Sequence, residues 1–246
     1  MGKGEPTMKF EDLKITIYAD GADIEGMKEE YRKGYAKGFT TNPTLMKKAG
    51  VKDYVSFAKA ALCEISDLPL SFEVFADDFE MMEKEAKIIA ALGENVYVKI
   101  PITNSVGESS IPLIKRLSEA GLKLNVTAML TLDQVSETIA AFAPGTQNIV
   151  SVFAGRIMDT GVDATLIMKE VSDLCRKKPG TLSLWASCRE VYNIIQADAC
   201  GTDIITVTND ILAKLPNLGK DLTQLSLETV QMFARDGKSL GYSILG

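Results

Sequence analysis

Eight short apolar runs of the β type, each followed by a segment with a helical pattern, constrain the fold of this chain more than any other feature. The runs are ITIYAD, KGFTTN, LSFEVFA, VYVKIPI, KLNVTAM, NIVSVFA, LSLWAS and DIITVT. Intervening segments such as DDFEMMEKEAKIIAALG repeat apolar residues at three- and four-residue spacing, which indicates a helix with one buried face. Strands this apolar are typical of a parallel sheet covered by helices, and eight strand–helix units in 246 residues match a closed barrel.

We therefore predict an α/β fold, a single (β/α)8 barrel (TIM barrel) with an additional C-terminal helix. The barrel with its helical tail is expected over residues 15–246, after an N-terminal extension at residues 1–14. No linker rich in Pro, Gly or Ser divides the chain. An open doubly wound sheet is the alternative, but no GxGxxG or GxxxxGK(S/T) loop follows the first predicted strand.

Charge and residue usage exclude several classes of function. A formal net charge of -6 disfavours nucleic-acid or membrane-surface partners, although local basic sites for small anions are compatible with it. No apolar run approaches the roughly 20 residues of a membrane span. The chain has no histidine and its four cysteines lack CxxC spacing, which removes most zinc sites and histidine-based triads. We predict a cytoplasmic protein with reduced thiols and with neither metal nor cofactor.

Polar residues gather on one side of several predicted strands, near their C-terminal ends. Side chains alternate across a strand, so residues two apart share a face. A single residue of this kind could face solvent or bond a loop. The set predicts an active site at the C-terminal mouth of a barrel. Its members are Asp20, Thr40, Asn42, Ser71, Glu73, Lys99, Asn125 and Thr127.

Lys99 is the most informative of these residues. Apolar neighbours in VYVKIPI are expected to strip its ammonium of water and to lower its pKa from about 10.4 toward neutrality, which produces a nucleophilic amine. An ion pair with Asp20 or Glu73 is the structural alternative. Lys37 and Lys123 lie at strand starts, hence at the opposite face of the barrel. Lys99 is thus the lysine placed for Schiff-base chemistry with a carbonyl substrate.

Six ordered motifs carry a resemblance to a known family. GFTTNP, FEVFA, VYVKIP, LNVTAML, SVFAGRI and LWASCRE, between Ile15 and the C-terminus, resemble the transaldolase family, in particular its short-chain branch related to fructose-6-phosphate aldolase. The resemblance implies a class I aldolase barrel in which Lys99 forms the imine. It also implies transfer of a three-carbon dihydroxyacetone unit from a ketose phosphate, such as fructose 6-phosphate or sedoheptulose 7-phosphate, to an aldose.

The resemblance also implies the acid–base residues. Asp20 resembles the first-strand aspartate that takes and returns the proton of the C4 hydroxyl during carbon–carbon cleavage. Glu73 and Thr127 resemble the pair that holds a water molecule for proton shuttling as the carbinolamine dehydrates. Because the chain has no histidine, a carboxylate must do this work. A charge paired for stability is the alternative for Glu73.

Residues that resemble substrate ligands follow the same strands. Asn42 and Asn125 resemble the amides that hold hydroxyls of the three-carbon unit, with Thr40 and Ser151 nearby. Either asparagine could instead bond loop backbone. Phe153 takes the place of a tyrosine found in the aldolase branch, and since it offers no proton to the enamine it favours transfer over release.

A phosphate-binding group is implied at the mouth, where Arg156 in AGRI and Ser187 with Arg189 in ASCRE resemble the family's ligands. An arginine fork with hydroxyl and amide donors binds a tetrahedral oxyanion well. The alternative for Arg189 is a surface ion pair with Glu190 or an aspartate. Cys188 departs from the family pattern beside this group.

Several functional alternatives stay open. They are an aldolase that releases free dihydroxyacetone, a specialised transaldolase for an unusual or sulfonated sugar, and a catalytically silent sugar-phosphate-binding barrel. The C-terminal LTQLSLETVQMFARDGKSLGY has the pattern of an amphipathic helix and a tail. The resemblance implies ring-like homo-oligomers, such as pentamers or decamers, in which this segment packs on a neighbour.

Overall fold

The computed structural model describes residues 9–245, so residues 1–8 of the predicted N-terminal extension lie outside the described residues. The chain divides into two compact units. One comprises Lys14–Ala213, and the other joins the described residues before it, 9–13, to those after it, 214–245.

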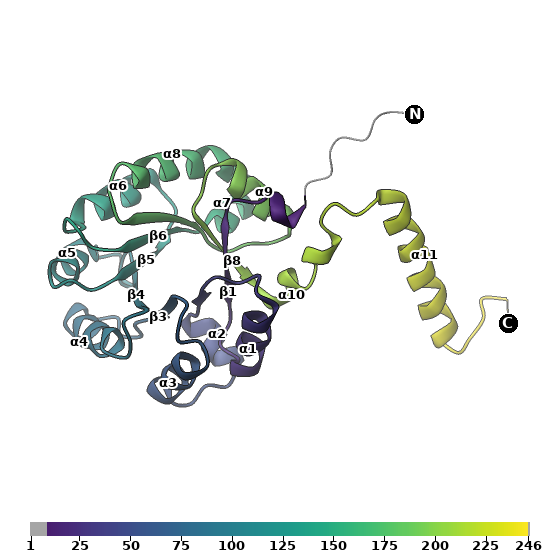
Figure 1. The fold of residues 1–246 in the computed structure, drawn as a ribbon, viewed down its shortest axis with the longest axis horizontal. Helices are drawn as coiled ribbons and strands as arrows, with labels where there is room; N and C mark the ends of the chain where they lie inside the picture. Colours follow the sequence, from purple (N-terminus) through teal and green to yellow (C-terminus); the bar gives the residue numbers. More distant parts are fainter. Residues whose placement is uncertain (1–8, 246) are drawn as a thin grey trace. The chain divides into compact units, whose positions relative to one another are not determined.

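The first unit is a closed barrel of eight parallel strands in sequential order, as predicted (Figure 1). Each strand pairs with its neighbours in the sequence, and β1 also pairs with β8. The strands are β1 Thr16–Asp20, β2 Phe39–Thr40, β3 Leu70–Glu73, β4 Val96–Pro101, β5 Leu124–Met129, β6 Asn148–Val152, β7 Thr181–Trp185 and β8 Ile204–Thr208.

Helices follow every strand of the barrel, which confirms the predicted alternation. Figure 1 shows them outside the strands. They are α1 Ile24–Lys33, α2 Pro43–Lys48, α3 Tyr54–Glu64, α4 Phe79–Ala90, α5 Ile111–Glu119, α6 Leu132–Ala141, α7 Ala154–Asp159, α8 Ala164–Arg176, α9 Tyr192–Ala199 and α10 Asn209–Leu212. Side-chain caps fix several of their first turns. Asp23 accepts from the backbone N–H of Gly26 at α1, and Thr131 with Gln134 forms a capping box at α6.

Two strands end earlier than their apolar runs, for local reasons. The run KGFTTN forms only the two-residue β2, because Asn42 already caps α2 by accepting from the N–H of Leu45 at 3.0 Å. The run LSFEVFA leaves the sheet after Glu73, because the Glu85 carboxylate accepts from the N–H groups of Phe75 and Ala76. Both strands therefore stop near the polar residues of the mouth.

The barrel interior below the mouth is an apolar cluster. Tyr18 packs there with Ile149, Leu184 and Ile204, all of them buried. The Tyr18 ring packs against Gly38, the residue before β2, and a side chain there would not fit, since a Cβ built on Gly38 would lie 2.5 Å from the ring. This packing closes the floor of the barrel beneath the polar layer.

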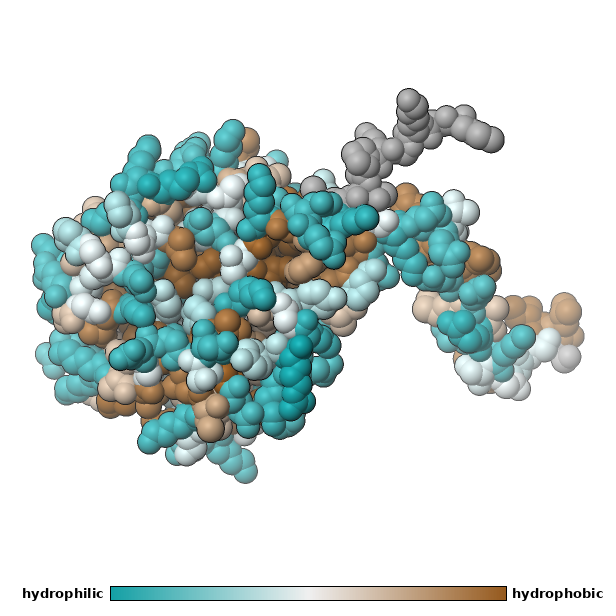
Figure 2. Space-filling model, in the orientation of Figure 1, coloured by the Kyte–Doolittle hydropathy of each residue, from teal (hydrophilic) through white to brown (hydrophobic). Residues whose placement is uncertain are grey.

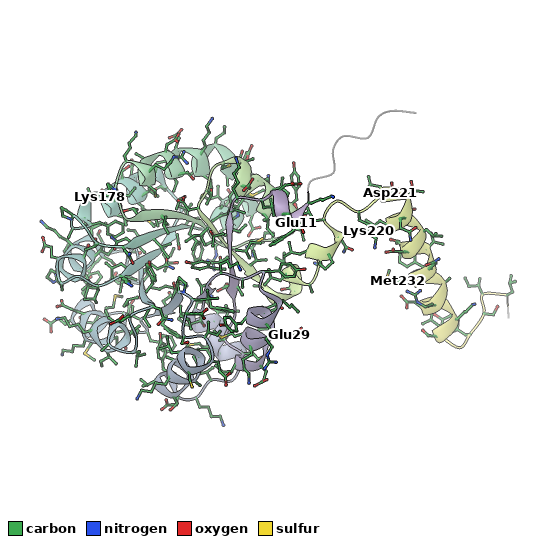
Figure 3. All side chains as sticks on the ribbon, in the orientation of Figure 1. Glu11, Glu29, Lys178, Lys220, Asp221 and Met232 are labelled. Carbon is green, nitrogen blue, oxygen red and sulfur yellow. The ribbon has the colours of Figure 1, made fainter. Side chains whose placement is uncertain are left out.

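The second unit contains the predicted C-terminal helix, α11 Leu222–Ser239, preceded by the short 3-10 helices η1 Phe10–Asp12 and η2 Leu215–Asn217. Asp221 caps α11 by accepting from the N–H of Gln224, and Lys220 forms an ion pair with Glu228; Figure 3 labels Lys220 and Asp221 at this end. Apolar side chains along α11 are exposed, as the brown atoms of Figure 2 show. Among the described residues, no helix has the length and apolarity needed to cross a membrane.

Candidate active site

Strand register brings the predicted residues to one level of the barrel mouth. Asp20 is paired with Thr40 across β1 and β2, and Lys99 is paired with both Glu73 and Asn125. A cavity of about 120 Å³ opens at this level. Ten of the thirteen residues predicted at the mouth line it: Asp20, Thr40, Asn42, Lys99, Asn125, Thr127, Ser151, Phe153, Arg156 and Ser187.

Lys99 is buried, with 6% of its surface exposed. Its Nζ lies 3.1 Å from Glu73 Oε2 and donates to the Thr41 carbonyl at 2.8 Å. The ion pair that the sequence left as an alternative is therefore present. Glu73 does not line the cavity, but its carboxylate reaches the amine, and its backbone carbonyl accepts from the Tyr54 hydroxyl at 2.7 Å. A proton acceptor is thus in contact with the amine in the resting protein.

Asp20 faces the same cavity and accepts a hydrogen bond from the Thr40 hydroxyl at 2.7 Å. Burial raises the pKa of Asp20, while the positive charge of Lys99 and the Thr40 hydrogen bond act in the opposite direction. A carboxylate with a raised pKa is a stronger base than an ordinary one, so Asp20 is suited to take a proton from a substrate hydroxyl.

Asn125 is held by a buried hydrogen-bond chain. Its Nδ2 donates to Ser71 Oγ at 3.1 Å, and its Oδ1 accepts from Ser151 Oγ at 2.6 Å. One N–H of the amide remains for a ligand. Asn42 uses its oxygen to cap α2, which leaves its Nδ2 group as the free donor. Both predicted asparagines thus meet the cavity as hydrogen-bond donors with fixed amides.

Thr127 is buried, and its hydroxyl has no hydrogen-bond partner among the described residues. It stands at an irregularity of β5, where the pairing with β6 shifts between Val126 and Met129 and Ala128 adopts a left-handed backbone with φ of 62°. Because buried hydroxyls are normally hydrogen-bonded, the free Thr127 Oγ1 indicates a place for a water molecule or a substrate hydroxyl.

The rim of the cavity is built from α7 and the segment after β7. The Arg156 guanidinium lies over the Phe153 ring, 5.0 Å from its centre. Ser187 has a left-handed backbone with φ of 65°, a strained conformation for a residue other than glycine. A Cβ built on Gly155 would lie 1.7 Å from the Ser187 carbonyl oxygen, so α7 approaches this segment backbone to backbone.

We expect Gly155→Ala to lower the free energy of unfolding by about 1–3 kcal/mol, because either α7 or Ser187 must move. The displaced Ser187 should also raise the KM for a substrate bound in the cavity that Ser187 lines. Urea denaturation and steady-state kinetics check the two effects. Gly237→Ala is the matched control, since a Cβ at Gly237 meets no atom within 4 Å. Equal stability of the two variants would contradict the close approach.

Arg189 lies outside the cavity lining, where its guanidinium forms an ion pair with Asp159. The predicted alternative of a surface pair with an aspartate is therefore present in the structure. Helix α9 begins at Tyr192, after this segment, and Asn193 accepts from the N–H of Arg189 at 2.8 Å. Cys188 does not line the cavity; its thiol donates to the Glu190 carbonyl.

Three lining residues were not predicted as site residues: Leu184, Ala186 and Thr206. Thr206 was predictable, because in the run DIITVT it lies on the face of the strand that points into the barrel. Leu184 and Ala186 are apolar, so the sequence indicates only that they lie on the same face of a strand and gives no sign that they line a site. Among residues 9–245, no cluster of three or more Cys, Asp or Glu side chains has the geometry of a metal site.

Comparisons with known proteins identify the family to which this chain is similar. The family model described as Transaldolase/Fructose-6-phosphate aldolase matches residues 17–244. A "Probable transaldolase" of Methanococcus maripaludis strain C7 is 37% identical over 204 residues, which cover 82% of this chain and 90% of the relative. A "Probable transaldolase" of Erythrobacter litoralis is 32% identical, over 94% of this chain and the whole relative.

Solved structures with far lower identity share the fold. The crystal structure of KGPDC from Streptococcus mutans matches 81% of this chain and 89% of its own, with a TM-score of 0.53 and 12% identity. That likeness concerns the barrel alone. The family match covers nearly the whole chain, and the chain belongs to the transaldolase/fructose-6-phosphate aldolase family.

Proposed function

We propose that this protein is a lysine Schiff-base transaldolase that moves a dihydroxyacetone unit from a ketose phosphate to an aldose. The observation that carries the proposal is the contact of the buried Lys99 amine with the Glu73 carboxylate, beside a cavity lined by Asp20. A buried lysine amine can form an imine with a ketone, and a carboxylate in contact with it can accept and return the protons that the steps require.

The first half of the reaction uses Lys99 and Glu73. Glu73 accepts a proton from the ammonium, and the free amine attacks the C2 carbonyl of the ketose to give a carbinolamine. Loss of the C2 hydroxyl as water leaves an iminium ion. A water molecule at the unpaired Thr127 hydroxyl relays the proton that this departure needs.

The second half uses Asp20. Its carboxylate removes the proton of the C4 hydroxyl, the C3–C4 bond breaks, and the bonding electrons pass into the iminium to give an enamine. The aldose leaves. The enamine then attacks the aldehyde of a second aldose, Asp20 returns its proton to the new hydroxyl, and hydrolysis frees Lys99.

Phe153 supports transfer rather than release. It lines the cavity and is packed beneath the Arg156 guanidinium, and its ring carries no proton for the enamine. The enamine then persists until an acceptor aldehyde arrives.

Two measurements test the proposal. Borohydride reduction in the presence of fructose 6-phosphate should trap a covalent adduct on Lys99, and dihydroxyacetone transfer should require an acceptor such as erythrose 4-phosphate. Free dihydroxyacetone that accumulates equally fast without acceptor would instead identify an aldolase. A protein that gives no adduct with any ketose phosphate would be a sugar-phosphate-binding barrel.

We also propose a homo-oligomer, in which α11 packs against a neighbouring copy. None of the described side chains of α11 is buried, and Leu227, Val230 and Phe233 are at least half exposed. An isolated helix of this length gains most of its stability from packing of its apolar face. A monomeric mass in sedimentation would contradict this.

We also propose that the enzyme is located in the cytoplasm. Its four free cysteines support this proposal.

A further inference from the structure

The Arg189–Asp159 ion pair leaves half of the guanidinium free. Nε donates to Asp159 Oδ1 at 3.3 Å, and Nη2 donates to Oδ2. Of the five N–H groups of an arginine, this side-on contact uses two. The end-on edge, formed by Nη1 and the second N–H of Nη2, has no partner among the described residues. That edge has the fork geometry that binds a carboxylate or a phosphate through two parallel hydrogen bonds.

Both ends of Arg189 are held in place. Its backbone N–H donates to the Oδ1 of Asn193, which is buried. Its guanidinium is held by Asp159, the last residue of α7. The first contact fixes the backbone from which the side chain starts, and the second removes much of the rotamer freedom that a long side chain at a protein surface otherwise keeps.

Asp159 also links Arg189 to the rim of the cavity. It stands three residues after Arg156 on α7, and α7 meets the segment of Arg189 through the Gly155 N–H, which donates to the Ala186 carbonyl at 3.3 Å. The short helix therefore carries one arginine that lines the cavity and one carboxylate that holds the second arginine beside it. Arg156, Ser187 and Arg189 are thereby tied to one backbone junction.

We propose that Asp159 is a positioning residue for Arg189, which it fixes by one edge so that the other edge meets the oxyanion of the substrate. This inference rests on the proposed function for its substrate, a phosphorylated sugar. Asp159 touches neither the cavity nor the reacting carbons, so it acts through Arg189 alone. Because both side chains are about half exposed, with 49% and 53% of their surfaces accessible, loss of the carboxylate leaves no buried charge behind.

The test compares Asp159→Asn with the wild-type protein in binding and in kinetics. The Kd for inorganic phosphate, measured by titration calorimetry, and the KM for fructose 6-phosphate should both rise about two- to fivefold, the range expected for loss of one well-oriented exposed ion pair. The kcat should stay within about twofold. Borohydride trapping with dihydroxyacetone, which carries no phosphate, should be unchanged, because it reads the Lys99 site only.

The same substitution made in an Arg189→Ala protein shows whether Asp159 acts only by positioning Arg189. There, Asp159→Asn should add nothing to the loss already caused by Arg189→Ala, since the two residues act as one unit. Tighter phosphate binding in Asp159→Asn would overturn the proposal and make Asp159 a competitor for Arg189. Unchanged binding or additive losses would overturn it as well. A wild-type protein that binds phosphate but traps no dihydroxyacetone would contradict the proposed function and leave the role of Asp159 standing.

Discussion

Replacement of Lys99 with methionine is expected to lower kcat by about 10⁴-fold or more and to abolish the borohydride-trapped adduct, because the covalent intermediate can no longer form. Methionine keeps much of the length of the buried side chain without the amine. The trapped adduct is read by mass spectrometry of the intact protein, and turnover is read in the coupled transfer assay with an acceptor sugar.

Two controls accompany this variant. Lys123→Met removes a lysine at the opposite end of the barrel, whose Nζ donates to the Glu94 carbonyl, and should leave turnover within about twofold. Lys99→Met alone leaves Glu73 without its cation, which lowers stability. The double variant Lys99→Met/Glu73→Gln should recover the melting temperature without recovering turnover. A Lys99→Met protein that folds and turns over normally would end the Schiff-base assignment.

Asp20→Asn is expected to lower kcat by about 10²–10⁴-fold, the usual contribution of a positioned general base. The amide oxygen can still accept the hydrogen bond of Thr40, so the cavity keeps its shape. Imine formation does not need Asp20, and borohydride should therefore still trap the ketose on Lys99. A loss of trapping equal to the loss of turnover would mean that Asp20 acts before carbon–carbon cleavage.

The same variant makes a prediction about stability and pH. Burial raises the pKa of Asp20, so the folded protein keeps this proton to a higher pH than the unfolded chain does. The stability that the protonated carboxyl contributes is present at low pH and is lost as the pH rises through the raised pKa. Asparagine does not titrate, so Asp20→Asn should gain melting temperature over the wild type between acidic and neutral pH. A constant difference would contradict the raised pKa.

Much of the fold followed from alternation alone. Runs such as VYVKIPI and NIVSVFA are apolar on both faces, and that pattern fits few structures other than a covered parallel strand. The ends of KGFTTN and LSFEVFA were less predictable, because the cap at Asn42 and the backbone contacts of Glu85 depend on residues that meet only after folding.

The site was predictable where strand parity decides it. Asp20, Lys99 and Asn125 lie on the inward face of β1, β4 and β5, so their convergence needs only the closed barrel. The residues of the rim do not lie on strands, so strand parity does not predict which of them meet. Asp159 lies on a short helix thirty positions before Arg189, and no local pattern indicates that the two side chains pair.

Backbone strain at the mouth links part of the protein's thermal stability to the residues of the site. The left-handed residues other than glycine in the described chain are Ala128 and Ser187, and both adjoin the site. Such residues cost about 1–2 kcal/mol each relative to glycine. Glycine at position 128 would recover that free energy and remove only a methyl group, whereas at position 187 it would also remove the hydroxyl of a residue that lines the cavity. A substitution for stability should therefore leave substrate binding intact at position 128, whereas at position 187 a gain in stability should come with weaker substrate binding.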